Sequence, residues 1–436
     1  MTQRLLLAAC AVLLLAAGLV WWLQQRTPQP IALTPTLTGE VEYCLTCHAD
    51  LAEISPSHPI ESFGCVLCHG GERLALEADL AHSSMRGGAN PSDLSVVEQS
   101  CGGSDCHSGP ASEWRNHIER VKSSIMATYA GAIAQVRNAF GAQPDLAARY
   151  AIRSVQDTTL PSLTEILSLE EFDSASEADP RLQTFAENCL DCHLWTAARD
   201  GDAYARYTGC AACHSPLPPL FAGEGQDEVG VPTPTLPLLA GEGRGEVGVH
   251  TLTTAIPYTQ CNTCHNRGHY DVHTLTFTER TPNPESRALD YYPATVQLAR
   301  CELTLDCIDC HTHIESMGCA DIHADQASID HMCSACHGTL YDLPLTRTLT
   351  DPNDIAFRFA ALNPVIDLQL GDIILVSEHR EQPLWNIRLL ADGSYELFGK
   401  ASGERYVFHA VKGSGCQQQN DQQASQYCHA CHAVER

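Results

Sequence analysis

The segment Cys307-Ile-Asp-Cys310-His311 has two cysteines separated by two residues and followed at once by histidine, and this pattern recurs along the chain. It occurs eight times, and a ninth segment, Cys101-Gly-Gly-Ser-Asp-Cys106-His107, has four residues between its cysteines. The other regular copies begin at Cys44, Cys65, Cys189, Cys210, Cys261, Cys333 and Cys428. The nine motifs use 18 of the 22 cysteines in a chain of 436 residues. The fold and the function must therefore be explained from these motifs.

The C-x-x-C-H motif is the attachment site of c-type haem. Each cysteine sulfur forms a thioether with one haem vinyl group, and the histidine supplies a nitrogen to the iron. Zinc sites and redox disulfides also use C-x-x-C pairs, but neither requires a histidine after the second cysteine. We expect the longer third motif to bind haem as well, through an outward turn at Gly102-Gly103 that glycine permits cheaply. The sequence thus predicts about nine covalently attached haem c groups, eight on C-x-x-C-H and one on C-x-x-x-x-C-H.

On these motifs, which extend from Cys44 to His432, the chain resembles the multihaem c-type cytochromes. The fold class expected is mostly α and irregular, packed around haem, with little regular secondary structure and one small antiparallel β subdomain near residues 366–412. The predicted attachment cysteines and proximal iron ligands are Cys44, Cys47, His48, Cys65, Cys68, His69, Cys101, Cys106, His107, Cys189, Cys192, His193, Cys210, Cys213, His214, Cys261, Cys264, His265, Cys307, Cys310, His311, Cys333, Cys336, His337, Cys428, Cys431 and His432.

Twelve histidines lie outside the motif positions, which is more than nine irons need as second axial ligands. The chain has only five methionines, so we expect mostly bis-histidine haems of lower potential, with Met85, Met317 and Met332 as alternative ligands. The best candidates lie within a short loop of a motif. The candidate distal ligands are His58, His82, His117, His250, His269, His313, His323, His331 and His429. No motif has Lys in place of its His, the mark of a catalytic haem in multihaem nitrite and tetrathionate reductases, and this disfavours an enzyme.

Residues 5–23 form an apolar run without a charge, long enough to cross a bilayer and ending in the interfacial pair Trp21-Trp22. We interpret residues 1–26 as a membrane anchor. The alternative is a signal peptide cleaved after Ala16-Ala17-Gly18, which would give a secreted protein. Either interpretation places the body of the protein outside the cytoplasm, where haem is attached. Residues 27–40, rich in Pro and Thr, are a predicted linker.

The motifs divide the rest of the chain. We expect a haem-binding region over 41–110 (haems 1–3), a helical segment over 111–185, a second haem-binding region over 186–340 (haems 4–8) and a ninth haem site over 416–436. The low-complexity stretch 216–250 is a predicted surface insertion, and its G-x-G-x-x-G match lacks the strand and helix context of a nucleotide site. The first two motifs and the fourth and fifth share their spacing, with Gly64 and Gly209 at equivalent positions, which suggests a duplicated two-haem unit.

Residues 341–415 form the predicted β subdomain. Short strands are expected at 370–376, 385–390, 395–398 and 406–409, joined by Gly-containing hairpin turns. In an oxidising compartment Cys301 and Cys319 could form a disulfide around the seventh motif, which leaves Cys416 without an assigned partner.

The net charge of −27 disfavours a nucleic-acid partner, because phosphate contacts need Lys and Arg. Crowded haems with two protein ligands pass single electrons and lack an open site for substrate. We therefore expect an electron-transfer protein, not an enzyme, that connects membrane or periplasmic donors to periplasmic or extracellular acceptors. Its partners would be other redox proteins with basic surfaces. A multihaem oxidoreductase with one five-coordinate haem and a subunit of an extracellular cytochrome filament, and hence a homo-oligomer, are the alternatives.

Overall fold

The computed structural model describes residues 14, 16–18, 29–49, 51, 53–88, 90–156, 168–190, 194–195, 208–215, 250–262, 264–265, 268–271, 276–279, 299–319, 333–378, 381–417, 419, 422 and 425–434. The predicted anchor and the insertion at 216–250 lie almost wholly outside them. Cys192 and His193 of the fourth motif, and His323 and His331, also lie outside the described residues. Within the described part of the chain, no helix combines the length and the apolar character needed to span a membrane.

The chain forms two compact units, residues 1–91 and residues 92–436. The boundary separates the first two haem motifs from the remaining ones. Unit 1 contains short helices that coincide with its two motifs, lie between them or follow the second one. They are η1 (Cys44–Thr46), α2 (Ile60–Phe63), α3 (Val66–His69) and α4 (Ala78–Ala81).

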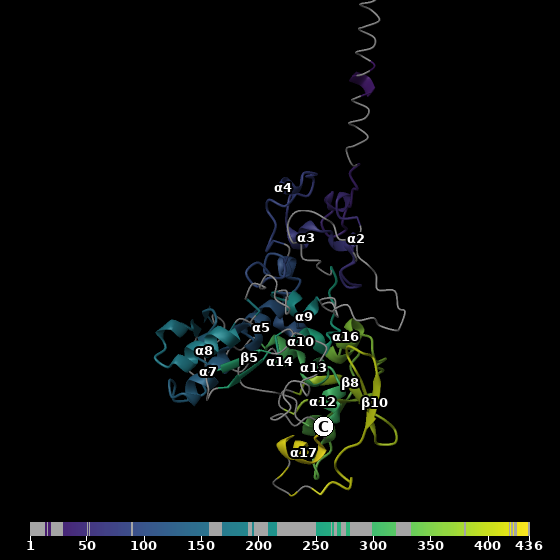
Figure 1. Cartoon of the computed structure of the whole chain (residues 1–436). Helices are drawn as coiled ribbons and strands as arrows, with labels where there is room; N and C mark the ends of the chain where they lie inside the picture. The colour runs from purple at the N-terminus through teal and green to yellow at the C-terminus, as the bar shows by residue number, and fades with distance from the viewer. Residues whose placement is uncertain are drawn as a thin grey trace, which may run out of the picture. The chain divides into compact units, whose positions relative to one another are not determined.

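Unit 2 is built mainly from short helices, several of which are the motifs themselves (Figure 1). The motif helices are α9 (Ala211–His214), α10 (Tyr258–Cys261), α13 (Cys307–Cys310), α15 (Cys333–His337) and α17 (Ser425–His432). The other helices are η2 (Gly103–Asp105), η3 (Ala111–Glu113), α5 (His117–Ser123), α6 (Ile125–Thr128), α7 (Ala130–Ala139), η4 (Ser174–Ser176), α8 (Pro180–Cys189), α12 (Arg300–Thr304), α14 (His313–Met317) and α16 (Ile355–Leu362).

The predicted small antiparallel sheet is present and has one more strand than expected. Its order is β10-β9-β8-β7-β6, and all neighbours are antiparallel. The strands are β6 (Thr346–Thr348), β7 (Ile373–Val376), β8 (Pro383–Leu389), β9 (Tyr395–Phe398) and β10 (Arg405–Phe408). The extra strand β6 is short and polar, Thr-Arg-Thr, so it carries no apolar alternation to reveal it.

Both faces of this sheet are covered. On one face, Ile374 and Trp385 pack in a core with α16, which lies beside β8 (Figure 1). On the other face, Leu375 and Tyr395 belong to a core against which Cys336 of the eighth motif packs. The sheet therefore packs directly against the helix of the eighth motif.

The predicted helical segment 111–185 is not one continuous helix: helices at its start (η3, α5, α6 and α7) and at its end (η4 and α8) flank short strands, and the first helices are broken. Ser124 is extended between α5 and α6, and its hydroxyl donates a hydrogen bond to the Val121 carbonyl 2.8 Å away. Tyr129, with φ of 57°, separates α6 from α7. Serine and threonine hydroxyls compete for backbone groups in this way. Beyond Gly141, three short strands form a separate small sheet with the order β1-β3-β2. They are β1 (Tyr150–Ala151), β2 (Val155–Gln156) and β3 (Ser168–Glu171).

A further two-stranded antiparallel ladder joins β4 (Gly268–Asp271) and β5 (Thr276–Glu279) just after the sixth motif. The predicted distal ligand His269 lies in β4, opposite Thr278. Its backbone is described, but its side chain lies outside the described residues.

Candidate haem-attachment sites

Five of the eight regular motifs share one backbone feature, a hydrogen bond from the histidine N–H to the carbonyl of the first cysteine. The donor–acceptor distance is 3.1 Å in motif 1, 2.9 Å in motif 2, 3.0 Å in motif 5 and 2.8 Å in motifs 6 and 7. This single helical turn places two thiols and an imidazole close together. The arrangement fits one haem edge bound by two thioethers above a histidine that reaches the iron.

The long third motif closes with the same bond across two more residues. The His107 N–H donates to the Cys101 carbonyl at 3.1 Å. The predicted Gly102-Gly103 outward turn is wrong in its position, because the left-handed residues are Ser104 (φ 53°) and Asp105 (φ 57°). Gly102 instead permits close packing, since a Cβ there would lie 2.8 Å from the Glu98 carbonyl oxygen and 2.8 Å from Ile118 Cδ1. The long motif therefore fits haem by the same closure as the regular ones.

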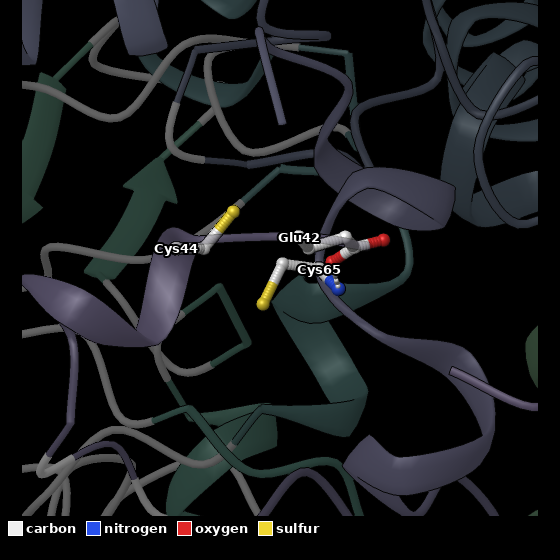
Figure 2. A group of neighbouring side chains, drawn as sticks. All are labelled: Glu42, Cys44 and Cys65. Carbon is white, nitrogen blue, oxygen red and sulfur yellow. Dashed lines mark hydrogen bonds between the residues drawn. The ribbon is translucent and has the colours of Figure 1, made fainter. Parts of the chain in front are cut away.

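In unit 1 a buried carboxylate orients the second motif. Glu42 is 2% exposed, and its Oε2 accepts hydrogen bonds from the backbone N–H groups of Cys65 (2.7 Å) and Val66 (3.3 Å), at the start of α3. The thiols of Cys44 and Cys65 are hydrogen-bonded neighbours, and their sulfurs lie with a Glu42 oxygen within 4.8 Å of one another (Figure 2). The first two motifs thus meet at their cysteines.

The predicted duplication is only partly visible. Gly64 and Gly209 both have positive φ, 63° and 60°, and both lie in close contact with a neighbouring segment. At motif 5, however, Ser92 replaces Glu42 as the acceptor: its carbonyl binds the Cys210 N–H at 3.2 Å and its hydroxyl binds the Ala211 N–H at 2.8 Å. The equivalent glycines therefore serve the same close approach with different partners.

Two motif histidines face candidate distal histidines. The rings of His48 and His82 have centroids 6.1 Å apart, and those of His107 and His117 are 5.4 Å apart. Imidazoles that share one metal have ring centres about 6 Å apart, given metal–nitrogen bonds of about 2.0–2.1 Å. His82 and His117 therefore fit as distal ligands of haems 1 and 3, with a slight opening required at the second pair.

Three other motif histidines turn Nδ1 to an oxygen acceptor. The Nδ1 atom of His214 lies 2.8 Å from the Thr253 carbonyl oxygen, that of His337 lies 3.2 Å from the His409 carbonyl oxygen, and that of His311 lies 3.3 Å from a Glu315 carboxylate oxygen. Such an acceptor fixes the proton on Nδ1 and leaves the lone pair on Nε2 for a metal. This is the tautomer that an axial haem ligand needs.

His117 and His313 are buried and held neutral. Burial, reinforced by the neighbouring His107, lowers the pKa of His117 to about 4. Burial, reinforced by Arg120, lowers the pKa of His313 to about 3. Nδ1 of His117 and Nε2 of His313 are buried without a hydrogen-bond partner. A buried polar atom left without a partner is costly, and an iron ligated at the His313 nitrogen would remove that cost.

The remaining candidate ligands are placed less favourably. His58 has Nδ1 3.1 Å from the Ser55 hydroxyl and packs on Phe63. His250 lies on the segment that leads to Thr253, the partner of His214. Nε2 of His429 lies 2.9 Å from a Glu302 carboxylate oxygen, which an iron at this nitrogen would have to displace.

In unit 2 successive motifs lie side by side. The Gln260 amide, next to Cys261, donates to the Ala212 carbonyl inside motif 5 at 2.5 Å. The Tyr258 N–H, at the start of α10, donates to Asp306 Oδ1, the N-cap of α13, at 2.8 Å. The thiols of Cys261 and Cys307 form a hydrogen bond. Motifs 5, 6 and 7 are therefore neighbours.

The series continues in both directions. Cys310 of motif 7 lies near Cys336 of motif 8, and α15 packs against α17, which carries motif 9. At the other end, Cys210 of motif 5 lies near Cys101 of motif 3. Burial raises the pKa of the Cys210 and Cys336 thiols to about 12, and both residues are partly buried. Among the described residues, adjacent motifs follow the order 3, 5, 6, 7, 8, 9.

The predicted Cys301–Cys319 disulfide is not formed in the described part of the chain. Cys301 lies instead near Cys310 and Cys336, against the motif 7 and motif 8 sites. Cys416 is also a thiol.

Several residues that hold the motifs in place were not predicted from the sequence. Asp306 precedes its motif at a helix N-cap position, so a capping rule could have found it. Ser92, Thr253 and Lys400 come from distant segments, and no local pattern links them to a motif.

No protein-family model, no curated protein and no solved structure matches the chain.

Proposed function

We propose that this chain is an exported multihaem c-type cytochrome that carries single electrons along about nine closely spaced haems. The single observation that carries the proposal is the pairing of motif histidine His48 with His82 and of His107 with His117, with ring centroids 6.1 Å and 5.4 Å apart, close to the separation expected for two axial ligands. Haem bound between two such histidines cycles between ferric and ferrous iron without an open coordination site.

The packing of the motifs supports transfer between haems. Two pairs of cysteines from different motifs are hydrogen-bonded neighbours, Cys44 with Cys65 and Cys261 with Cys307. The haem edges that these cysteines would hold therefore lie close together. The polypeptide contributes spacing, orientation and a dry surrounding, while the redox chemistry belongs to the cofactor.

The membrane and partner assignments rest on the sequence. The apolar run 5–23 would anchor the protein with its haems outside the cytoplasm, between a membrane or periplasmic donor and a periplasmic or extracellular acceptor. The charge of −27, to which haem propionates would add, favours redox partners with basic docking surfaces.

Electron paramagnetic resonance of the ferric protein, combined with carbon monoxide addition to the reduced protein, tests the proposal. We expect low-spin ferric signals and little carbon monoxide binding, because both axial positions of most haems are occupied. A strong high-spin signal with stoichiometric carbon monoxide binding at one haem would favour the substrate-binding oxidoreductase instead.

A further inference from the structure

Lys400, in the turn between β9 and β10, contacts the attachment loop of motif 7 twice. Its backbone N–H donates to Asp309 Oδ1 at 2.7 Å, and its side-chain Nζ donates to the Ile308 carbonyl oxygen at 2.6 Å. Ile308 and Asp309 are the two residues between the haem-binding cysteines Cys307 and Cys310. The β subdomain therefore delivers a cation into the loop of a haem-attachment site.

The surroundings of this cation amplify its electrostatic effect. Asp309 is 2% exposed, and the Lys400 ammonium lies 5.8 Å from the centre of the Trp385 ring. Burial lowers the pKa of Lys400, and the neighbouring Asp309 opposes that change. Lys400 also interacts with Cys310 and with Cys336 of motif 8. In such a poorly solvated place a charge acts on its neighbours more strongly than at the surface.

The carboxylate of Asp309 accepts hydrogen bonds from two backbone N–H groups. Oδ2 accepts the Asp306 N–H at 2.9 Å, while Oδ1 accepts the Lys400 N–H. Burial raises the pKa of Asp309, and the bond from Lys400 opposes that rise. The lysine thus offsets a buried negative group that stands directly against the motif 7 site.

We propose that Lys400 raises the reduction potential of the haem held by Cys307, Cys310 and His311. Reduction adds one electron to the haem, and a fixed neighbouring cation stabilises the reduced form relative to the oxidised one. The inference rests on the proposed function, since it requires haem at motif 7. It gives the β subdomain, which carries no attachment motif of its own, a role in setting the energy profile of the electron path.

A potentiometric redox titration of the purified holoprotein, followed in the haem absorption bands, tests the inference. The test variants are Lys400→Gln, which keeps a hydrogen-bond donor, and Lys400→Met, which keeps an unbranched side chain without the charge. Both are expected to shift one component of the titration to more negative potential. Lys400→Arg is expected to restore the wild-type curve. Lys412→Gln, at an exposed lysine of the same region, is the matched control and is expected to leave the curve unchanged.

Haem content, measured on the wild type and on each variant by the pyridine haemochrome assay, distinguishes a failure of the proposed function from a failure of the role inferred for Lys400. A wild-type chain without covalent haem overturns the proposed function itself. Wild-type titration curves from both fully loaded variants overturn only the role of Lys400. Loss of one haem from both variants also overturns it, because Lys400 would then be a structural support of the site.

Discussion

Burial and hydrogen bonding decide which histidine nitrogen is available to a metal in this chain. Burial holds His117 and His313 neutral, while carbonyl or carboxylate acceptors at Nδ1 of His214, His311 and His337 keep the proton on Nδ1 and leave the lone pair on Nε2. The motif histidines could be predicted from sequence because their spacing to the cysteines is fixed. The pairing of His48 with His82 could not, because it depends on how the chain returns after the second motif.

Replacing His82 tests this pairing. His82→Ala is expected to convert one haem from low spin to high spin and to create one carbon monoxide site per chain, because the haem bound to His48 loses its second ligand. Electron paramagnetic resonance and carbon monoxide titration measure both effects. His409→Ala, which removes an exposed imidazole outside the motifs, should leave both unchanged. An unaltered spectrum in His82→Ala would show that His82 is not an axial ligand.

The two adjacent glycines of the long motif make a matched pair of tests. A Cβ at Gly102 would press on the Glu98 carbonyl and on Ile118, whereas a Cβ at Gly103 meets nothing within 4 Å. Gly102→Ala is expected to destabilise the protein by roughly 1–3 kcal/mol, the usual cost of overpacking, or to lower haem loading at motif 3. Gly103→Ala should behave as wild type. Urea unfolding and haem content provide the measurements, and equal behaviour of the two variants would refute the packing argument.

The sheet β6–β10 is the part of the fold that sequence patterns predicted best. Its core strands have alternating or continuous apolar residues, and its turns contain Gly393 and Gly403 with positive φ. The polar strand β6 had no such signal. The helical region after the third motif was predicted as one segment, but local hydroxyl bonds at Ser124 and the left-handed Tyr129 interrupt it. Helical periodicity does not reveal such interruptions.

An ion-pair network fastens the edge of this sheet and makes its stability depend on pH. Glu396 on β9 is 3% exposed; it pairs with Arg388 on β8 and, at 2.6 Å, with Arg405 on β10. Burial alone would raise its pKa, but the hydrogen bonds from Arg405 and Arg388 outweigh burial and lower it. Its stabilising contribution is therefore complete above the unfolded-state pKa of about 4.3 and is lost as the pH falls through the lower folded-state pKa.

Glu396→Gln is accordingly expected to cost roughly 1.5–3 kcal/mol at neutral pH, the value of hydrogen bonds to a charged group. The difference from wild type should shrink as the pH falls below about 4. Denaturant unfolding followed by tryptophan fluorescence at a series of pH values measures both. A destabilisation that is the same at pH 7 and at pH 3 would contradict the assignment.

The smaller compact unit, residues 1–91, contains two motifs, and the larger unit, residues 92–436, contains seven. Among the described residues of the larger unit, the motifs follow one another in space as 3, 5, 6, 7, 8 and 9. The sequence did not predict this order, because it depends on contacts between distant segments such as that of Cys210 with Cys101. The number of motifs follows from local spacing, whereas their order in space follows from long-range contacts. Motif 6 lies in the middle of this series.

Removing haem 6 should therefore divide the series. A Cys261→Ala and Cys264→Ala double variant is expected to show a slow phase of electron redistribution after pulse-radiolytic reduction, because transfer must cross a longer gap. The matched double variant Cys189→Ala and Cys192→Ala removes haem 4, which is not needed to connect motifs 3 and 5, and should lack the slow phase. If both variants show the same kinetics, the inferred order is wrong.

The central claim is that the cysteine pairs of the motifs are covalent attachment sites for haem. The most direct measurement is the number of haems per chain, obtained from the pyridine haemochrome spectrum together with the mass of the denatured mature protein. We predict nine covalently bound haems, including one on the Cys101–Cys106 pair. A chain that carries far fewer, or that binds zinc at these cysteines in their place, would contradict the account.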